Sequence, residues 1–257
     1  MVESVEVTAM VIGTSPVNEY DKRVVLLTKE RGKMTAFARG ARRQYSALMG
    51  STQLFAFGTF RVIEGKNAYT LVSAEIKNYF EQLPKDPIRA CYASYFLEMA
   101  SYYARENNNE VELLKLLYQT LRILCRDAVP MPLIRVIYEL RIFVVNGEYP
   151  ECFHCIHCGN ETALSHFSPA RSGMICDRCL SEGGRLYFIS PSTLYTIQYI
   201  LTAPIEKLYT FNVSPEVLRE LQKMMKGYIE EHIDKTFKSL EILELMEDTI
   251  VQNIEKS

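Results

Sequence analysis

The chain of 257 residues has 48% hydrophobic and 23% charged residues and a net charge of −2, which is typical of a globular protein with a sizeable core. No apolar run reaches membrane-spanning length, and an N-terminus with Glu3, Glu6 and no basic region argues against a secretory signal peptide. Seven cysteines, an odd number, indicate a reducing compartment rather than a disulfide framework, so we expect a cytoplasmic protein.

The charges are distributed unevenly along the chain. Residues 1–80 contain eleven Lys and Arg against seven Asp and Glu, so the rest of the chain is acidic. The imbalance is sharpest over Lys22–Arg43, where eight basic residues accompany Glu30 as the single acidic residue. One concentrated basic segment in an acidic protein indicates a local site for a polyanion.

Residues 1–80 have the pattern of a small β-barrel. Apolar and polar residues alternate in several short runs, and turn-forming residues such as Ser15-Pro16 and Gly32 separate these runs. Eighty residues are too few for a β-sandwich and favour a closed five-stranded barrel of the OB type. A small SH3-like barrel is the alternative. The predicted strands lie near Val5–Gly13, Arg23–Thr28, Lys33–Arg39, Leu54–Ile63 and Ala68–Ile76.

From Asp86 onward the pattern is helical. Asp86-Pro87, Ser190-Pro191 and Ser214-Pro215 each place a capping side chain before a proline, and Gly147 is a good stop signal. Cys91 and Cys125 fall among apolar neighbours and are expected to be buried. The predicted helices cover residues 86–106, 110–126, 133–146, 190–202, 214–232 and 239–251. We therefore predict an α+β chain with a barrel domain at 1–80, a helical domain at 81–150 and 189–257, and an inserted segment at 151–188.

Two CxxC pairs, seventeen residues apart, predict a metal site in the inserted segment. This spacing is typical of a zinc ribbon, and Gly159 allows a tight turn after the second cysteine. A shell of four thiolates has no open position, so we expect one structural Zn²⁺ per chain rather than catalytic zinc. Cys152, His154 and His157 are alternative ligands, and metal-free thiols are a further alternative. The preferred ligands are Cys155, Cys158, Cys176 and Cys179.

The basic segment is the predicted nucleic-acid site. In an extended third strand, Lys33, Thr35, Phe37 and Arg39 share one face, so cations can contact phosphates while the ring stacks on a base. The alternative is a solvated barrel surface with Phe37 in the core. The predicted DNA-binding residues are Lys22, Arg23, Lys29, Arg31, Lys33, Phe37, Arg39, Arg42 and Arg43.

Sequence motifs for catalysis are missing. The chain contains no P-loop, no HExxH and no GxSxG. The tyrosine-rich stretch at 92–103 is expected to serve core and interdomain packing, with an apolar groove for a partner peptide as the alternative. We therefore predict a protein that is not an enzyme. Two other classes stay open: a zinc-ribbon scaffold that binds proteins, and a metal-dependent nucleic-acid hydrolase.

Three stretches of the basic region resemble a known family. Asp21–Val25, Leu27–Lys33 and Arg39–Arg43 are similar to the N-terminal signature of the bacterial recombination mediator RecO family. The similarity continues through Gly147–Pro150 and both CxxC pairs, so it covers nearly the whole chain and weakens after about residue 200.

The resemblance implies an OB-fold domain joined to a helical domain that carries a zinc ribbon. It also implies a protein of DNA repair and recombination that binds single- and double-stranded DNA and anneals complementary strands. Such proteins work with RecR to load RecA onto strands coated by single-strand-binding protein (SSB), whose C-terminal tail binds the helical domain. Two departures matter: Gln44–Leu48 stand where family members often have further Lys and Arg, and some relatives lack the cysteines. The resemblance therefore makes the metal a support for the fold.

Overall fold

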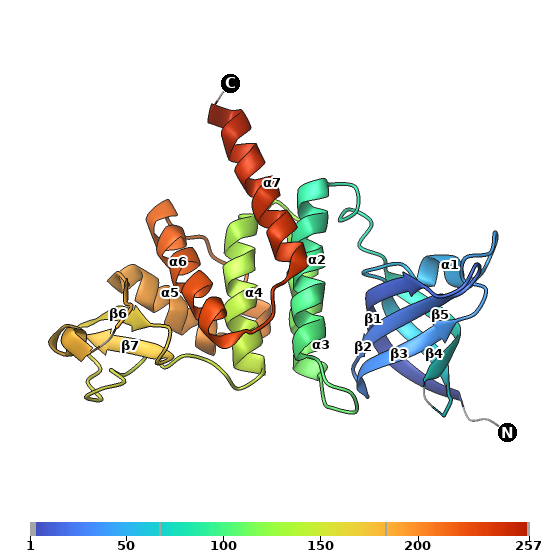
Figure 1. Ribbon diagram of the computed structural model, residues 1–257, viewed down its shortest axis with the longest axis horizontal. Coiled ribbons are helices and arrows are strands. Elements are labelled where there is room, and N and C mark those ends of the chain that lie inside the picture. The colour runs from blue at the N-terminus through green and yellow to red at the C-terminus, as the bar shows by residue number, and fades with distance from the viewer. Residues whose placement is uncertain (1–3, 67, 183, 256–257) are drawn as a thin grey trace. The chain divides into compact units, whose positions relative to one another are not determined.

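Alternating apolar side chains close the first part of the chain into a barrel. The computed structural model describes residues 4–66, 68–182 and 184–255. Five strands close in the order β1-β2-β3-β5-β4, all antiparallel to their neighbours except for the parallel pair β3–β5 (Figure 1). Inward residues such as Val24, Leu26, Phe60 and Val62 are fully buried. This confirms the OB-type barrel. The strands are β1 Ser4–Pro16, β2 Lys22–Thr28, β3 Gly32–Ala38, β4 Phe57–Glu64 and β5 Tyr69–Asn78.

The segment between β3 and β4 differs from the prediction. It contains a short helix, α1 Leu48–Ser51, that the sequence did not indicate. The predicted fourth strand began at Leu54, which is wrong because Phe55 has a φ of 72°, outside the extended region, so the strand starts at Phe57. Residues 39–56 therefore form one long connection at an end of the barrel.

Three helices complete the unit that contains the barrel. They are α2 Pro87–Tyr103, α3 Val111–Leu124 and α7 Lys238–Glu255. The Asp86 carboxylate caps α2 as predicted, because it accepts hydrogen bonds from the N–H groups of Ile88 (3.0 Å) and Arg89 (3.3 Å). At the start of α7, the Ser239 hydroxyl donates to the Glu98 carboxylate (2.6 Å) and Phe237 packs edge-on against Tyr95. The last helix of the chain thus packs on α2.

The remaining residues form a second unit around three helices and a small sheet. Its helices are α4 Met131–Val145, α5 Pro191–Thr202 and α6 Pro215–His232, and the short 3₁₀ helix η2 Ile205–Lys207 lies between α5 and α6. The Ser190 and Ser214 hydroxyls cap α5 and α6 through the N–H groups of Thr193 and Val217, as the Ser-Pro pairs predict. The sheet has the order β7-β6-β8 and precedes α5. Its elements are β6 Leu164–Ser168, β7 Gly173–Cys176, the 3₁₀ helix η1 Asp177–Glu182 and β8 Tyr187–Phe188.

The contacts group these elements into two compact units. The first is Met1–Cys125 with Phe237–Ser257, and the second is Arg126–Thr236. The second unit is thus inserted in the sequence of the first, whereas the predicted segments placed the last helix with α5 and α6. Within the described ranges, none of the helices has the length and apolar character needed to cross a membrane.

Two cysteines outside the CxxC pairs lie in the first unit. Cys91 and Cys125 are half-buried, rather than fully buried as expected. The Cys91 thiol lies 3.1 Å from the Met246 sulfur, where α2 meets α7. Cys91 therefore belongs to helix packing, and Cys125 lies at the end of α3.

Gly32 is predicted to be the least replaceable residue of the β2–β3 turn. Its φ is +65°, and an added Cβ would lie 2.2 Å from the Arg105 carbonyl oxygen. The Lys33 N–H donates to that same oxygen (2.9 Å), and the Asn107 N–H donates to the Arg31 oxygen (3.0 Å), so the turn pairs with the chain after α2. Gly32→Ala should cost about 1–3 kcal/mol from backbone strain, before the steric clash is added. Chemical denaturation of the purified variant measures this loss.

Gly40→Ala is the matched control for this substitution. Gly40 lies in the same unit and also has a positive φ, +67°, but the nearest atom to an added Cβ is an Arg43 carbon at 3.6 Å. Gly40→Ala therefore measures the cost of backbone strain without a clash. Equal losses of stability in the two variants would show that the close approach of residues 105–108 to Gly32 adds nothing to the cost.

Candidate nucleic-acid interface and metal centre

The β2–β3 hairpin divides the predicted basic site into two groups. Lys22 pairs with Ala38 at one end of the hairpin, and Thr28 pairs with Gly32 at the other. The six residue steps between Lys22 and Thr28 span about 20 Å of extended chain. We call the first group the cationic end and the second the hairpin tip. The cationic end consists of Lys22, Arg23, Arg39, Arg42 and Arg43, and the hairpin tip of Lys29, Arg31 and Lys33.

Two of the three cations at the hairpin tip are held by the protein itself. The Arg31 guanidinium binds the Tyr69 hydroxyl (3.2 Å) and the Glu64 carboxylate (3.0 Å), and these hydrogen bonds raise the pKa of Arg31. The Lys33 ammonium donates to the Ser101 carbonyl oxygen of α2 (2.8 Å). Lys29 is exposed. Arg31 and Lys33, which the sequence predicts to bind DNA, therefore make contacts inside the protein: Arg31 within the barrel and Lys33 between the barrel and α2.

At the cationic end, Asp21 organises two loops. Its carboxylate accepts the Gly40 N–H at 2.7 Å, and this bond is the main reason why the pKa of Asp21 is lowered, with Arg39 and Arg43 adding to the effect. The neighbouring Arg42 donates from its backbone N–H to the Tyr20 carbonyl oxygen (2.9 Å). These hydrogen bonds join the loop before β2 to the loop after β3 and so order the second loop, which carries Arg39, Arg42 and Arg43.

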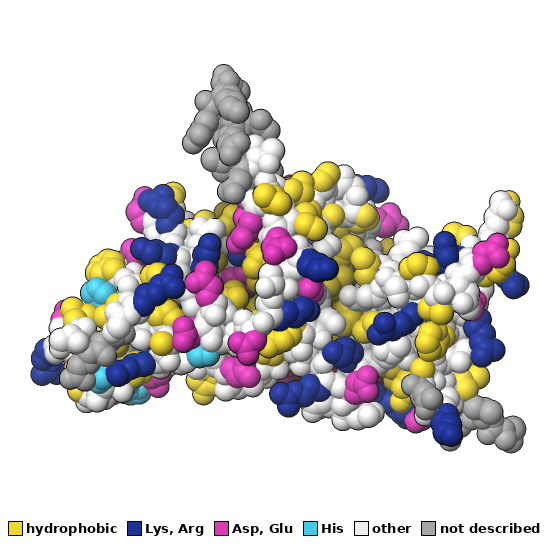
Figure 2. Space-filling view, viewed as in Figure 1, with side chains coloured by type: hydrophobic (Ala, Val, Ile, Leu, Met, Phe, Trp, Pro, Cys, Tyr) yellow, Lys and Arg dark blue, Asp and Glu magenta, His cyan; other side chains and the backbone are white. Residues whose placement is uncertain are grey.

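The cationic end concentrates like charges. Arg23, Arg39, Arg42 and Arg43 are exposed, and Lys and Arg side chains lie on the visible face of the barrel (Figure 2). The Lys22 ammonium is half-buried against the Thr52 hydroxyl (3.3 Å), and partial burial, together with the nearby charge of Arg42, lowers the pKa of Lys22. Cations held this close favour a ligand with several negative charges, such as a phosphate backbone.

Aromatic side chains accompany these cations. Phe37 is half-buried on the outer face of β3, where it lies opposite Arg23 of β2 and beside Thr70 of β5. The sequence prediction missed Tyr20 and Tyr45. Tyr45 is 90% exposed in the loop after β3, and the Arg43 guanidinium lies 5.0 Å from the centre of the Tyr20 ring. Tyr20 precedes Asp21-Lys22-Arg23 in the sequence and Tyr45 follows Arg42-Arg43-Gln44, so their positions beside the basic motifs are a usable signal.

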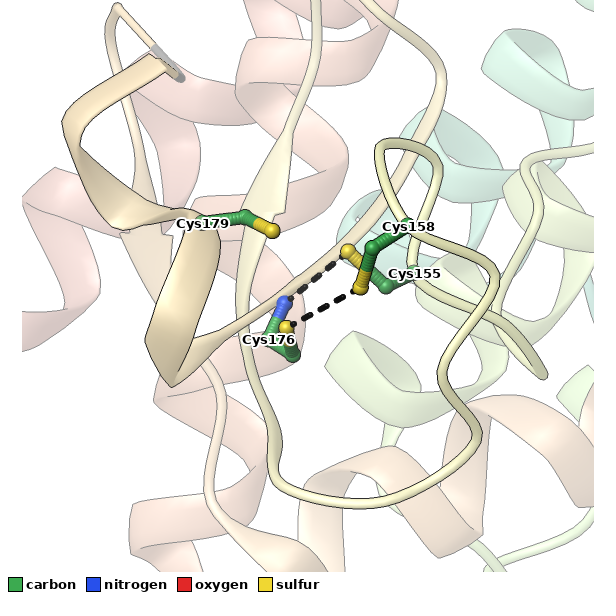
Figure 3. Close-up of side chains that lie close together, drawn as sticks. All are labelled: Cys155, Cys158, Cys176 and Cys179. Carbon is green, nitrogen blue, oxygen red and sulfur yellow. Dashed lines mark hydrogen bonds between the residues drawn. The ribbon is translucent and has the colours of Figure 1, made fainter.

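The four predicted cysteine ligands come together in the second unit. Cys155 and Cys158 lie in the turn before β6, Cys176 ends β7, and Cys179 lies in η1, with their side chains directed toward one another (Figure 3). The Gly159 N–H donates to the Cys155 carbonyl oxygen (2.8 Å) with a φ of +71°, which closes the turn. All four sulfurs lie within 4.8 Å of one another.

This arrangement fits a tetrahedral metal ion. The sulfurs of Cys158 and Cys176 lie 3.6 Å apart. Zinc bonded to four thiolates places neighbouring sulfurs about 3.8 Å apart. Burial raises the pKa of the Cys155 thiol, but hydrogen bonds from the N–H groups of Cys176, Cys158 and His157 outweigh it and lower that pKa to about 6. The cluster therefore could hold a metal ion, and peptide N–H groups favour the thiolate form of one ligand.

The alternative ligands lie outside this cluster. Cys152 is buried, and burial raises the pKa of its thiol well above the ordinary value. His154 lies 3.4 Å from the carboxylates of Glu151 and Glu161. His157 contacts the Arg171 guanidinium. Among the residues that the structure describes, the group with ligand geometry is Cys155, Cys158, Cys176 and Cys179.

Comparison with known proteins identifies the family. The model of the recombination protein O N-terminal region matches residues 1–80, and that of the C-terminal region matches residues 84–241. The DNA repair protein RecO of Alkaliphilus metalliredigens is 32% identical over 87% of this chain and 92% of its own length. The proteins of the same name from Acetivibrio thermocellus and Symbiobacterium thermophilum are 30% and 31% identical, each over 93% of this chain and 96% of their own lengths. The chain therefore belongs to the recombination protein O (RecO) family, as its basic motifs and paired cysteines predict.

Proposed function

We propose that this chain is a DNA-binding mediator of recombination and repair. It binds single- and double-stranded DNA, anneals complementary strands, and acts with RecR to load RecA onto strands coated by SSB. The family membership and the name of its relatives, DNA repair protein, support the repair and recombination role. The bacterial cytoplasm is the compartment where such a protein meets DNA.

The cationic end is the observation that carries the proposal. Lys22 and Arg23 begin strand β2, and Arg39, Arg42 and Arg43 lie in the loop after β3. Hydrogen bonds of Asp21 and of the Arg42 backbone join that loop to the loop before β2, so the charges are ordered before a ligand arrives. Such preordering reduces the conformational entropy lost on binding. A phosphate backbone supplies the repeated negative charge that such a group favours.

Strand annealing follows from this electrostatic binding. Two complementary strands repel each other through their phosphates, and a protein that neutralises part of that charge lowers the repulsion. Contacts to phosphates carry no sequence information and leave the base edges available for pairing. The reaction makes and breaks no covalent bond, so it needs neither a nucleotide nor a catalytic residue.

The metal has a structural role in this proposal. Cys155, Cys158, Cys176 and Cys179 would hold Zn²⁺ through four thiolates, which join the turn before β6 to the end of β7 and to η1. A full thiolate shell excludes substrate, so the ion supplies folding free energy and no Lewis-acid chemistry.

Contact with other recombination proteins completes the proposal. RecR and the C-terminal tail of SSB are the proposed partners, with the SSB tail on the helical part of the chain. The RecO resemblance that the sequence shows is the support for these partners.

A salt-resolved annealing assay, with and without SSB, tests the proposal. If about five phosphates of a single strand are neutralised, log K should fall against log salt with a slope near −3.5. Annealing of bare complementary strands and of SSB-coated strands should both be accelerated. A binding constant that does not change with salt, or a chain that leaves the annealing rate unchanged, would reject this function. DNA cleavage on addition of Zn²⁺, Mg²⁺ or Mn²⁺ would favour the hydrolase instead.

A further inference from the structure

Tyr45 combines high exposure with an unfavourable backbone conformation. Its side chain is 90% exposed, while its φ of 64° lies in the left-handed region that bulky residues rarely adopt. The surrounding loop fixes this conformation, since the Arg43 N–H donates to the Gly40 carbonyl oxygen (3.0 Å) and the Ser46 N–H to the Arg43 carbonyl oxygen (3.1 Å). A ring presented to solvent at the expense of backbone strain points to a ligand that contacts it.

The cations of the same loop indicate the chemistry of the ligand. Tyr45 follows Arg42 and Arg43 in the same loop, and Arg43 lies against the ring of Tyr20, which is 43% exposed. The backbone N–H of Arg42 is bonded to the Tyr20 carbonyl oxygen (2.9 Å), so the two tyrosines stand on loops that are joined to each other. Exposed rings on loops that also carry exposed arginines suit a ligand with both phosphates and planar bases.

We infer that Tyr45, assisted by Tyr20, stacks on unpaired nucleobases and gives the cationic end a preference for single-stranded over duplex DNA. This inference rests on the proposed function, because it assumes that DNA binds at the cationic end. Arginines contact the phosphates of both forms of DNA. A duplex has its bases stacked on one another, so the tyrosine ring gains a partner only on a single strand. Tyr45 is thus a specificity-determining residue.

Substitution of Tyr45 tests the inference through the ratio of two affinities. Stacking on one base contributes about 1–3 kcal/mol by alanine substitution, so Tyr45→Ala should weaken binding to an unstructured single strand at least about fivefold. Affinity for a duplex of the same length should change less than about twofold, since phosphate contacts are unaltered. Tyr45→Phe keeps the ring and should retain the single-strand affinity. Fluorescence anisotropy with labelled single and duplex DNA, at one salt concentration, measures all of these.

Two controls separate stacking from a structural effect. Tyr149→Ala removes a tyrosine that is 58% exposed in the other unit and should leave both affinities unchanged. Tyr45→Asn introduces a residue that tolerates the left-handed conformation, so its melting temperature should equal or exceed that of the unmodified chain while single-strand affinity falls as in Tyr45→Ala. A single strand with 5-iododeoxyuridine should crosslink on irradiation to the peptide that contains Tyr45.

Equal losses for single strands and duplex in Tyr45→Ala, or no loss for either, would overturn the inference while leaving the proposed function intact. Failure of the unmodified chain to bind either form of DNA would instead reject the proposed function itself.

Discussion

Replacing Arg39, Arg42 and Arg43 together with Glu is expected to weaken single-strand binding roughly a hundredfold at moderate salt. Three lost phosphate contacts at about 1 kcal/mol each account for this factor, and repulsion from the new carboxylates adds to it. The slope of log K against log salt should become shallower by about two units, since each contact contributes about 0.7 for single strands. Duplex affinity should fall as well, because phosphates are present in both forms.

A control variant with the same change in net charge separates a local site from a global effect. Lys85, Arg185 and Arg219 have side chains that are 73%, 69% and 67% exposed, and their ion pairs are surface pairs of small energy. Changing these three residues to Glu should reduce DNA affinity much less than the Arg39, Arg42 and Arg43 variant does. Equal losses for the two variants would place DNA binding elsewhere or make it a property of net charge alone.

Replacing Cys176 and Cys179 with Ser is expected to remove the metal and destabilise the second unit. Elemental analysis should show about one Zn²⁺ per unmodified chain and almost none in the variant. A structural zinc site contributes on the order of 10 kcal/mol of apparent binding free energy, which is lost with two of its thiolates. We expect a clear fall in melting temperature, whereas single-strand affinity, which we propose depends on the barrel, should change much less.

Two cysteines outside the cluster provide the control for this experiment. Cys91 and Cys125 lie in the first unit, and Cys91 contacts Met246 rather than the cluster. A variant with Ser at both positions should keep its zinc. A strong chelator added to the unmodified chain should remove the zinc and lower the melting temperature, as the replacement of Cys176 and Cys179 does. If DNA affinity fell in that variant without a loss of stability, the ribbon itself would contact DNA.

Local signals in the sequence predicted most of the fold. A capping Asp or Ser before a proline located the starts of α2, α5 and α6, because the cap and the proline act within one turn of the helix. The spacing of the cysteines predicted which sulfurs would meet. Helix α1 is too short to show a period, and the φ of Phe55 is set by its loop, so neither was visible in the alternation of residue types.

The sequence could not show which of the predicted DNA-binding cations are bound by other parts of the protein, because those contacts come from distant residues. The sequence places Lys33 and Arg39 on one face, but the Ser101 carbonyl oxygen that binds Lys33 comes from a helix far along the chain. Arg31 is held in the same way by Glu64 and Tyr69. Charge alone does not show such contacts. The structure shows that Arg42 and Arg43 are exposed in the loop after β3, where the Arg42 guanidinium donates to the Asn18 carbonyl oxygen (2.9 Å).

The insertion of the second unit into the sequence of the first has a consequence for synthesis on the ribosome. Helix α7 packs on α2, yet it is made only after Arg126–Thr236 has been translated. At 5–20 residues per second, that interval is about 5–20 s. During that time the nascent barrel unit cannot form the contacts of Phe237 with Tyr95 and of Ser239 with Glu98, so the surface of α2 that α7 covers stays exposed. The order of translation thus favours completion of the cysteine-containing unit before the unit that carries the cationic end.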